Sequence, residues 1–172
     1  MGVSNKKGLE AFTSYHDFSI GSALSKNIGW AEKVFADNIL LNLENKTNMP
    51  ISYKKMQQVM KMSKLFLSKE EYECNVDTLS NIIEDMSLLR IDLLKINAEN
   101  SEWDIISSVH NSHWDRIRQV IIEIHDENGI NLNKIFSFMQ GKGYACTFME
   151  DPTNINSSMK IYLVYCIKIG GK

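Results

Sequence analysis

The chain of 172 residues has few cysteines, only two prolines and no long hydrophobic run. Its three cysteines, Cys74, Cys146 and Cys166, are an odd number without a close pair, which indicates reduced thiols rather than disulfides or a zinc site. No apolar stretch approaches the roughly 20 residues of a membrane-spanning helix. We therefore expect a cytoplasmic chain that binds no membrane.

The sequence also lacks a strong charge of either sign. Nineteen basic and twenty-one acidic residues leave a net charge of −2, so nothing calls for a nucleic acid partner. Hydrophobic residues make up 44% and charged residues 23%, which is typical of a globular domain. We expect a disordered tail over residues 1–8 and one domain over residues 9–172.

The first part of that domain, residues 9–70, is predicted to hold a strand, a loop and a helical insert. Residues 9–15 alternate as a strand does, and residues 17–26 are rich in serine and glycine. Apolar positions at steps of three and four predict helices from residue 27 to about 43 and from 52 to 68. The second helix carries several methionines on the stripe expected to face the core.

The second part, residues 71–172, has the pattern of strands alternating with helices. The expected helices are residues 78–86, 101–109 and 131–140, and the expected strands are residues 90–96, 119–124, 144–149 and 161–167. The nearly continuous apolar run in the second of these strands is typical of a buried parallel strand. The last two strands are predicted to pair as an antiparallel hairpin. The fold class is therefore α/β, with about four core strands and flanking helices.

Polar side chains follow the first two of these strands, where open α/β sheets bind ligands. The first group lies in residues 97–102 and the second in residues 123–126. Alternation places Glu123 and His125 on the same face of their strand, with His125 at its end.

These two segments carry a resemblance to a known family. KINAENSEWDII (residues 95–106) and RIRQVIIEIHDENG (residues 116–129) resemble the C-terminal half of FkbM-like S-adenosylmethionine-dependent O-methyltransferases. The flanking segments GLEAFTSYHDFSIGSAL, CNVDTLSNIIEDMSLLRIDLLKI and IYLVYCI extend the resemblance to residues 8–168. The greatest likeness is to methyltransferase domains embedded in nonribosomal peptide and polyketide synthases. The resemblance implies a truncated, Rossmann-like class I methyltransferase half-sheet.

The features that hold the cofactor in that family are missing from this sequence. The nine glycines form no G-x-G-x-x-G turn, and no acidic residue closes a second strand ahead of the resemblance. The family typically writes K-I-D-V-E-G/K where this sequence has Asn97 and Asn100. We therefore expect no cofactor-binding residues and no cofactor for this chain alone, and S-adenosylmethionine only if a missing half is supplied.

If the missing half is supplied, transfer of a methyl group to a hydroxyl needs a general base. His125 is our candidate for the base, and Glu99 is our candidate to orient it or to stabilise its charged form. Alternatively, His125 is a structural histidine at a strand end and Glu99 a carboxylate favoured by the N-terminus of the next helix. The remaining histidines are expected to be structural or solvated, and no metal site is expected; they are His16, His110 and His113.

Two functions remain open. The first is a non-catalytic pseudo-methyltransferase domain of a polyketide or nonribosomal peptide synthase that acts as a structural or docking element. The second is the C-terminal half of an O-methyltransferase that is active only with a cofactor-binding half supplied elsewhere. In both cases the strand at residues 90–96 has an exposed edge. We expect self-association, another synthase domain, or a rearranged segment 9–68 to cover that edge, with the helix at 52–68 as the best internal cover. A carrier protein is a further possible partner.

Overall fold

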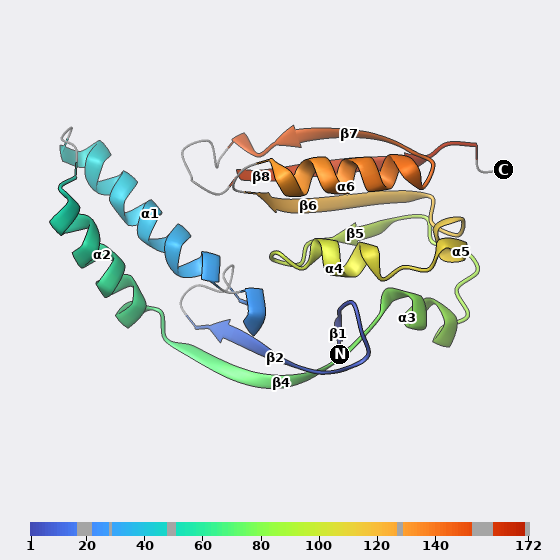
Figure 1. Ribbon diagram of the computed structural model, residues 1–172, viewed down its shortest axis with the longest axis horizontal. Helices are drawn as coiled ribbons and strands as arrows, with labels where there is room; N and C mark the ends of the chain where they lie inside the picture. Colours follow the sequence, from blue (N-terminus) through green and yellow to red (C-terminus); the bar gives the residue numbers. More distant parts are fainter. Residues whose placement is uncertain (17–21, 28, 48–50, 127–128, 153–159, 171–172) are drawn as a thin grey trace.

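Two four-stranded sheets organise the chain in the computed structural model, which describes residues 1–16, 22–27, 29–47, 51–126, 129–152 and 160–170 (Figure 1). The first sheet is built mainly from the N-terminal part of the chain, and the second from its C-terminal part. Among the described helices, none combines the length and the apolar composition that crossing a membrane requires.

The first sheet has the strand order β1-β4-β2-β3. Its strands are β1 (Gly2–Val3), β2 (Gly8–Tyr15), β3 (Ala23–Leu24) and β4 (Lys69–Asp77). β2 runs antiparallel to β4 along its whole length, and β1 pairs with β4 in parallel through Gly2 and Val76. The expectation of a disordered tail over residues 1–8 is therefore wrong, because β4 supplies backbone partners for the first residues.

Strand β4 is absent from the sequence prediction, because its segment KEEYECNVD is dominated by charged side chains. Its apolar side chains nevertheless alternate: Tyr72, Cys74 and Val76 share one face. Cys74 and Val76 face a cavity together with Phe12 of β2. This face is buried near Val76 and half exposed at Tyr72, whereas Thr13 and Tyr15 of β2 are buried on the opposite face.

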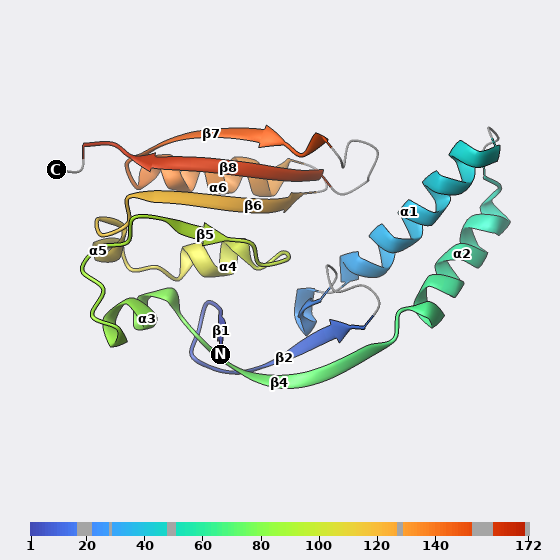
Figure 2. The same cartoon turned by 180° about the vertical axis from the view of Figure 1, so that it is seen from behind.

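Two helices, α1 (Gly29–Thr47) and α2 (Tyr53–Phe66), follow the 3-10 turn η2 (Ser25–Asn27) and pack along one another. The Ser52 side chain caps α2, as the expected helix boundary requires. Figures 1 and 2 show the pair projecting away from the second sheet. The helix expected to cover the strand at 90–96 therefore lies elsewhere. Its Met56 and Met60 are exposed, since among the described elements α2 packs mainly on α1.

The second sheet has the order β5-β6-β8-β7. Its strands are β5 (Leu94–Ile96), β6 (Gln119–Asp126), β7 (Tyr144–Glu150) and β8 (Lys160–Lys168). β5 and β6 are parallel, β8 is antiparallel to both of its neighbours, and β7 and β8 form the predicted antiparallel pair. This arrangement confirms the α/β fold class with four core strands. The residues that join β7 to β8 lie largely outside the described part of the chain.

Strand β5 is shorter than the expected strand at residues 90–96. Arg90 pairs with Asp92 side chain to side chain, and Ile91 makes only an isolated bridge to Ile117. The strand is also the end of its sheet, with no described strand on its outer side. A hollow of about 260 Å³ runs along this side and is bordered by Val3 and Leu79.

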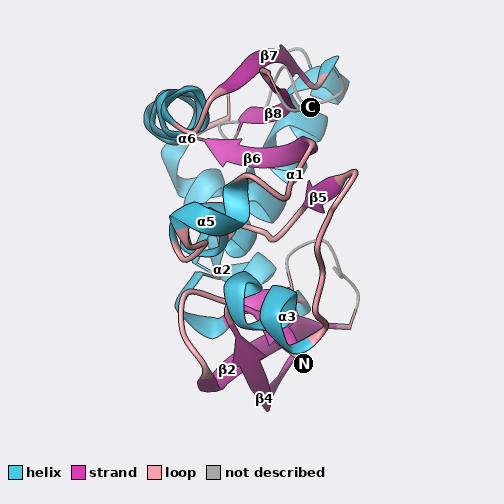
Figure 3. Ribbon diagram, turned by 90° about the vertical axis from the view of Figure 1, so that its right-hand side faces the viewer, coloured by secondary structure: helices cyan, strands magenta, loops and turns pink. Residues whose placement is uncertain are grey.

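Helices α3 (Leu79–Asp85), α4 (Glu102–Ser107), α5 (Asn111–Trp114) and α6 (Ile130–Gly141) accompany the second sheet (Figure 3). Figure 1 shows α4 and α6 in front of the strands, whereas Figure 2 shows no described helix over the opposite face. The main core lies on the covered side, where apolar side chains are almost fully buried: Ile83, Ile106, Trp114, Val120, Ile122, Ile124 and Met139.

Candidate functional site

The turn after β5 and the end of β6 lie side by side because the two strands are parallel and in register, with Ile96 opposite Ile122. Both predicted catalytic residues meet there. Nε2 of His125 lies 3.2 Å from Oε2 of Glu99. The contact is one of charge rather than a hydrogen bond, because Oε2 has no hydrogen-bond partner among the described residues. The pairing of strand ends thus brings together two residues 26 positions apart.

The other ring nitrogen of His125 contacts a residue that the sequence analysis did not select. Nδ1 lies 3.1 Å from Oε1 of Glu102, the first residue of α4. Both side chains are nearly inaccessible, with 1% of His125 and 4% of Glu102 exposed. A carboxylate at this position fixes the orientation of the imidazole. The sequence did contain a signal for this contact, because Glu102 follows Glu99 by three residues at the start of a predicted helix.

The turn that carries Glu99 has a left-handed backbone. Glu99 has φ of 42° and Asn100 has φ of 67°, a region that glycine adopts most easily and asparagine next. The backbone N–H of Asn100 donates to Oε1 of Glu102 at 3.1 Å. Asn100 therefore keeps the turn at a position where the resembling family has glycine, and Glu102 ties that turn to His125.

Glu123 completes the surroundings of the imidazole, as the alternation along its strand predicted. Its Oε1 lies 3.9 Å from Nε2 of His125. Glu123 is 23% exposed and Glu99 is 19% exposed, so solvent reaches these two carboxylates while His125 stays covered. Three carboxylates thus surround one buried imidazole.

These surroundings shift the pKa of two groups. Burial raises the pKa of Glu99 to about 7; the charge of His125 opposes this change, and the charges of Glu102 and Glu123 support it. For His125, burial acts to lower the pKa, but the hydrogen bond to Glu102 and the negative charges of the three carboxylates outweigh it and raise the pKa. The raised pKa of Glu99 places its carboxyl group in a range that suits proton transfer near neutral pH.

Asp126, the last residue of β6, has a structural role. Its Oδ1 accepts the backbone N–H of Gly129 at 3.0 Å, and its Oδ2 accepts that of Leu132 at 2.8 Å. Gly129 has φ of 77° at the start of α6, where a side chain would be strained. The carboxylate thus holds the first turn of the helix.

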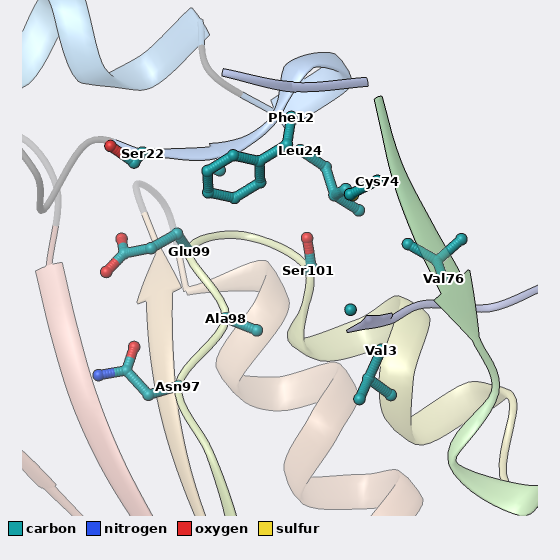
Figure 4. A pocket seen from close by; sticks show the side chains of 12 residues that line it. Val3, Phe12, Ser22, Leu24, Cys74, Val76, Asn97, Ala98, Glu99 and Ser101 are labelled. Atoms are coloured by element: carbon teal, nitrogen blue, oxygen red, sulfur yellow. The ribbon is translucent and has the colours of Figure 1, made fainter. Parts of the chain in front are cut away.

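A cavity of about 230 Å³ lies between the turn after β5 and the face of the first sheet that carries Phe12 and Val76 (Figure 4). Its lining is mostly apolar, with Phe12, Leu24 and Val76 from the first sheet and Ala98 from the turn. Figure 4 shows the Glu99 side chain turned away from Val76, out of the apolar part of this cavity. Glu99 is nevertheless one of the lining residues, so the cavity borders the charged cluster.

The described residues do not fit a methyl-donor cofactor. The sequence has no glycine-rich turn after a strand, and the N-terminal elements form a sheet with only one parallel strand pair, β1 with β4. The turn after β5 carries Asn97 and Asn100 in place of the aspartate and glycine of the resembling family. No described element supplies the row of backbone N–H groups and the acid that hold such a cofactor.

The other histidines lie apart from this cluster. Nε2 of His16 lies 3.0 Å from Oε1 of Glu70, and both side chains are half exposed. His110 is exposed, whereas His113 is buried and contacts Ser80. The expectation that each of these histidines is either structural or solvated agrees with their burial. It did not include the grouping of His110 and His113 with Glu84.

The sequence of the chain is similar to those of known proteins. Residues 19–146 match the family model described as methyltransferase FkbM domain. The chain is 30% identical over 150 residues to 31-O-demethyl-FK506 methyltransferase FkbM from Streptomyces tacrolimicus, covering 87% of this chain and 54% of that protein. It is 25% identical over 127 residues to AMB antimetabolite synthetase AmbE from Pseudomonas aeruginosa, covering 74% of this chain and 6% of the synthetase.

Among solved structures, the precorrin-6y C5,15-methyltransferase from Geobacter metallireducens superposes with a TM-score of 0.32 and 16% identity. That superposition covers 69% of this chain and 65% of the other. A TM-score at this level supports no conclusion about the site. The chain spans about half the length of its FkbM relative.

Proposed function

The chain belongs to the methyltransferase FkbM domain family, and we propose that it is the acceptor-side half of an O-methyltransferase that is inactive until a cofactor-binding half joins it. The observation that carries this proposal is the cluster of His125, Glu99 and Glu102 at the ends of two parallel strands. The FkbM relative is named as a methyltransferase of a 31-O-demethyl compound, which supports an oxygen atom as the methyl acceptor.

The cluster supports a proton path that begins at Glu99. His125 is 1% exposed, so an acceptor hydroxyl meets the more accessible Glu99 carboxylate first. Glu99 takes the hydroxyl proton, and its pKa of about 7 suits a base near neutral pH. His125, held by Glu102, stabilises the charge of Glu99 from behind. Burial thus favours the reverse of the roles that the sequence suggested, with Glu99 as the base and His125 as the positioning residue.

The open side of the second sheet supports docking of the missing half. By alternation, Tyr165 and Ile167 of β8 point to the face that no described helix covers, and they are 36% and 60% exposed. The outer edge of β5 on the same sheet is open to a further strand, and the hollow beside it has apolar walls from Val3 and Leu79. A parallel strand with its own helix would cover both surfaces.

A non-catalytic docking element in a synthase is the second candidate. The match to a small part of the synthetase AmbE supports this context. The first sheet supports it as well, because its described strands carry no glycine-rich turn of the kind that holds the cofactor. In that case the open edge of β5 would pair with another synthase domain or with a second copy of the chain. A carrier protein is a further possible partner. Exposed edge strands favour such pairing.

Calorimetry with S-adenosylmethionine separates these candidates. We expect no binding to the chain alone, and binding once the separately expressed N-terminal half of the Streptomyces tacrolimicus relative is added. The variant Glu99→Gln should then retain binding but lose methyl transfer by about 100-fold or more, since it removes the base. Binding to the lone chain would refute the claim of a missing cofactor site. An absence of binding in the mixture would favour the docking element.

A further inference from the structure

We propose that Glu84, His110 and His113 form a binding site for a divalent transition-metal ion of the zinc class. The site lies where the end of α3 meets α5, and it shares no residue with the cluster around His125. Each of the three side chains offers one donor atom, and all three atoms lie within 4.8 Å of one another. The site is independent of the proposed methyl-transfer function.

The local sequence brings the two histidines together. In the segment His110-Asn111-Ser112-His113, the first histidine caps α5 and the second lies in its single turn. Residues three apart lie on the same side of a helical turn, and the two rings stack with centroids 5.6 Å apart. His110 is exposed, so its ring can turn to aim a nitrogen at an ion.

His113 is the fixed member of the set. Only 3% of its side chain is exposed, and its Nδ1 lies 2.9 Å from Oγ of Ser80, which is fully buried. Ser80 also accepts the backbone N–H of His110 at 2.8 Å. When Nδ1 of His113 donates to Ser80, the lone pair of Nε2 is free. This is the arrangement in which an outer hydrogen bond orients a metal-binding histidine.

Glu84 faces that nitrogen. Its Oε1 lies 3.4 Å from Nε2 of His113, and its side chain is 58% exposed. Two donor atoms bound to one zinc ion, each about 2.1 Å from it, are at most about 4.2 Å apart. The observed separation therefore leaves space for an ion between the two atoms with little movement. The solvent side of the site stays open for water as a further ligand.

The donor set selects the kind of ion. Two imidazoles and one carboxylate form the ligand set of several zinc enzymes, and imidazole nitrogen favours zinc, copper or nickel over magnesium and calcium. Glu99, Glu123 and His125 also lie close enough to share an ion. That second group has one buried imidazole, which already contacts two carboxylates at Nε2, so it is the weaker candidate for zinc.

The first test is a titration of the full chain with Zn²⁺ alone, followed by calorimetry and by NMR of the histidine ring nitrogens. We expect the ring signals of His110 and His113 to move, while those of His16 and His125 stay in place. Glu84→Gln and His110→Gln should each weaken binding by more than about 10-fold, which is the lower end of the range for losing even a residue that only hydrogen-bonds to a metal ligand. Both positions are exposed, so both variants should fold.

His16→Gln is the matched control, since His16 is an exposed histidine paired with a glutamate but without a second imidazole among the described residues. It should bind Zn²⁺ as the unmodified chain does. The proposal is overturned if Glu84→Gln and His110→Gln bind as tightly as His16→Gln. It is also overturned if Zn²⁺ moves only the signals of His125 or His16.

Discussion

Oε1 of Glu102 lies 3.1 Å from Nδ1 of His125 and accepts the backbone N–H of Asn100 at the same distance. One buried oxygen therefore joins the end of β6 to the turn after β5. Because the same oxygen makes both contacts, Glu102 positions His125 and shapes the turn that presents Glu99. The first prediction tests this link.

Replacing Glu102 with Gln removes the buried charge but keeps the size of the side chain. We expect the free energy of unfolding to fall by about 1.5–3 kcal/mol, the range for hydrogen bonds to charged groups. The pKa of His125 should fall as well, since its largest stabilising contact is lost. Urea denaturation and an NMR titration of His125 measure the two effects.

Glu123→Gln is the control, because its contact with His125 is longer and partly exposed. This variant should lower the free energy of unfolding by less than about 1 kcal/mol. Equal losses in the two variants would contradict the role of Glu102.

The stability of the chain should fall as pH rises from about 5 to 8. The pKa of Glu99 is about 7 in the fold, above its ordinary 4.5, so folding favours its protonated form. This stabilisation is complete below pH 4.5 and is lost as pH rises through 7. The raised pKa of His125 acts in the same direction above pH 6.5.

Urea denaturation at several pH values should show that the free energy of unfolding falls over this pH range, and Glu99→Gln should flatten this slope. The exposed control Glu73→Gln should keep it; a slope unchanged by Glu99→Gln would refute the assignment.

The left-handed turn at Asn100 should distinguish substitutions by their backbone preference. Asn100→Gly should change the free energy of unfolding by less than about 0.5 kcal/mol, because glycine adopts φ of 67° without strain. Asn100→Val should reduce it by about 1–2 kcal/mol, because a β-branched residue bears the cost of a left-handed backbone that asparagine tolerates. Thermal denaturation of both variants measures the difference. Similar losses in the two would show that the Asn100 side chain, rather than the backbone, maintains the turn.

The hydroxyl of Tyr144 should contribute to stability through two buried acceptors. It donates toward the backbone carbonyls of Trp114 and Ile117, at 3.0 and 2.8 Å. Tyr144→Phe should cost about 1–3 kcal/mol, because it leaves both carbonyls without this partner. Tyr165→Phe is a suitable control, since Tyr165 is 36% exposed on the open face of the sheet. Chemical denaturation that gave the same loss for both variants would rule out this contribution.

The second sheet could be predicted because its strands and helices follow strong local patterns. The run from Val120 to Ile124 reads as a buried strand, and the expected neighbour at residues 90–96 brings Glu99 to His125 once the two strands are parallel. The sequence did not predict that β5 is shorter than residues 90–96. Arg90 and Asp92 pair with each other there instead of continuing the strand.

The first sheet and the inner side of the site were missed for a physical reason. Strand β4 is charged along most of its length, and β1 has only two residues, so their pairing depends on contacts between distant segments. Glu102 looked like an ordinary acid at a helix start, and its burial beside His125 follows only from the packing of α4 on β6. His110 and His113 were judged one at a time, although their spacing of three was visible.

The parallel pairing of Gly2 and Val3 with β4 fixes where the chain enters the fold. Val3 borders the hollow beside β5. An affinity tag fused ahead of Met1 would therefore be joined to the chain only two positions from the wall of that hollow. Strand β8, the last described strand, ends at Lys168 in the second sheet, on a different part of the molecule from β1 (Figure 1), so a C-terminal tag is the safer choice for the binding measurements.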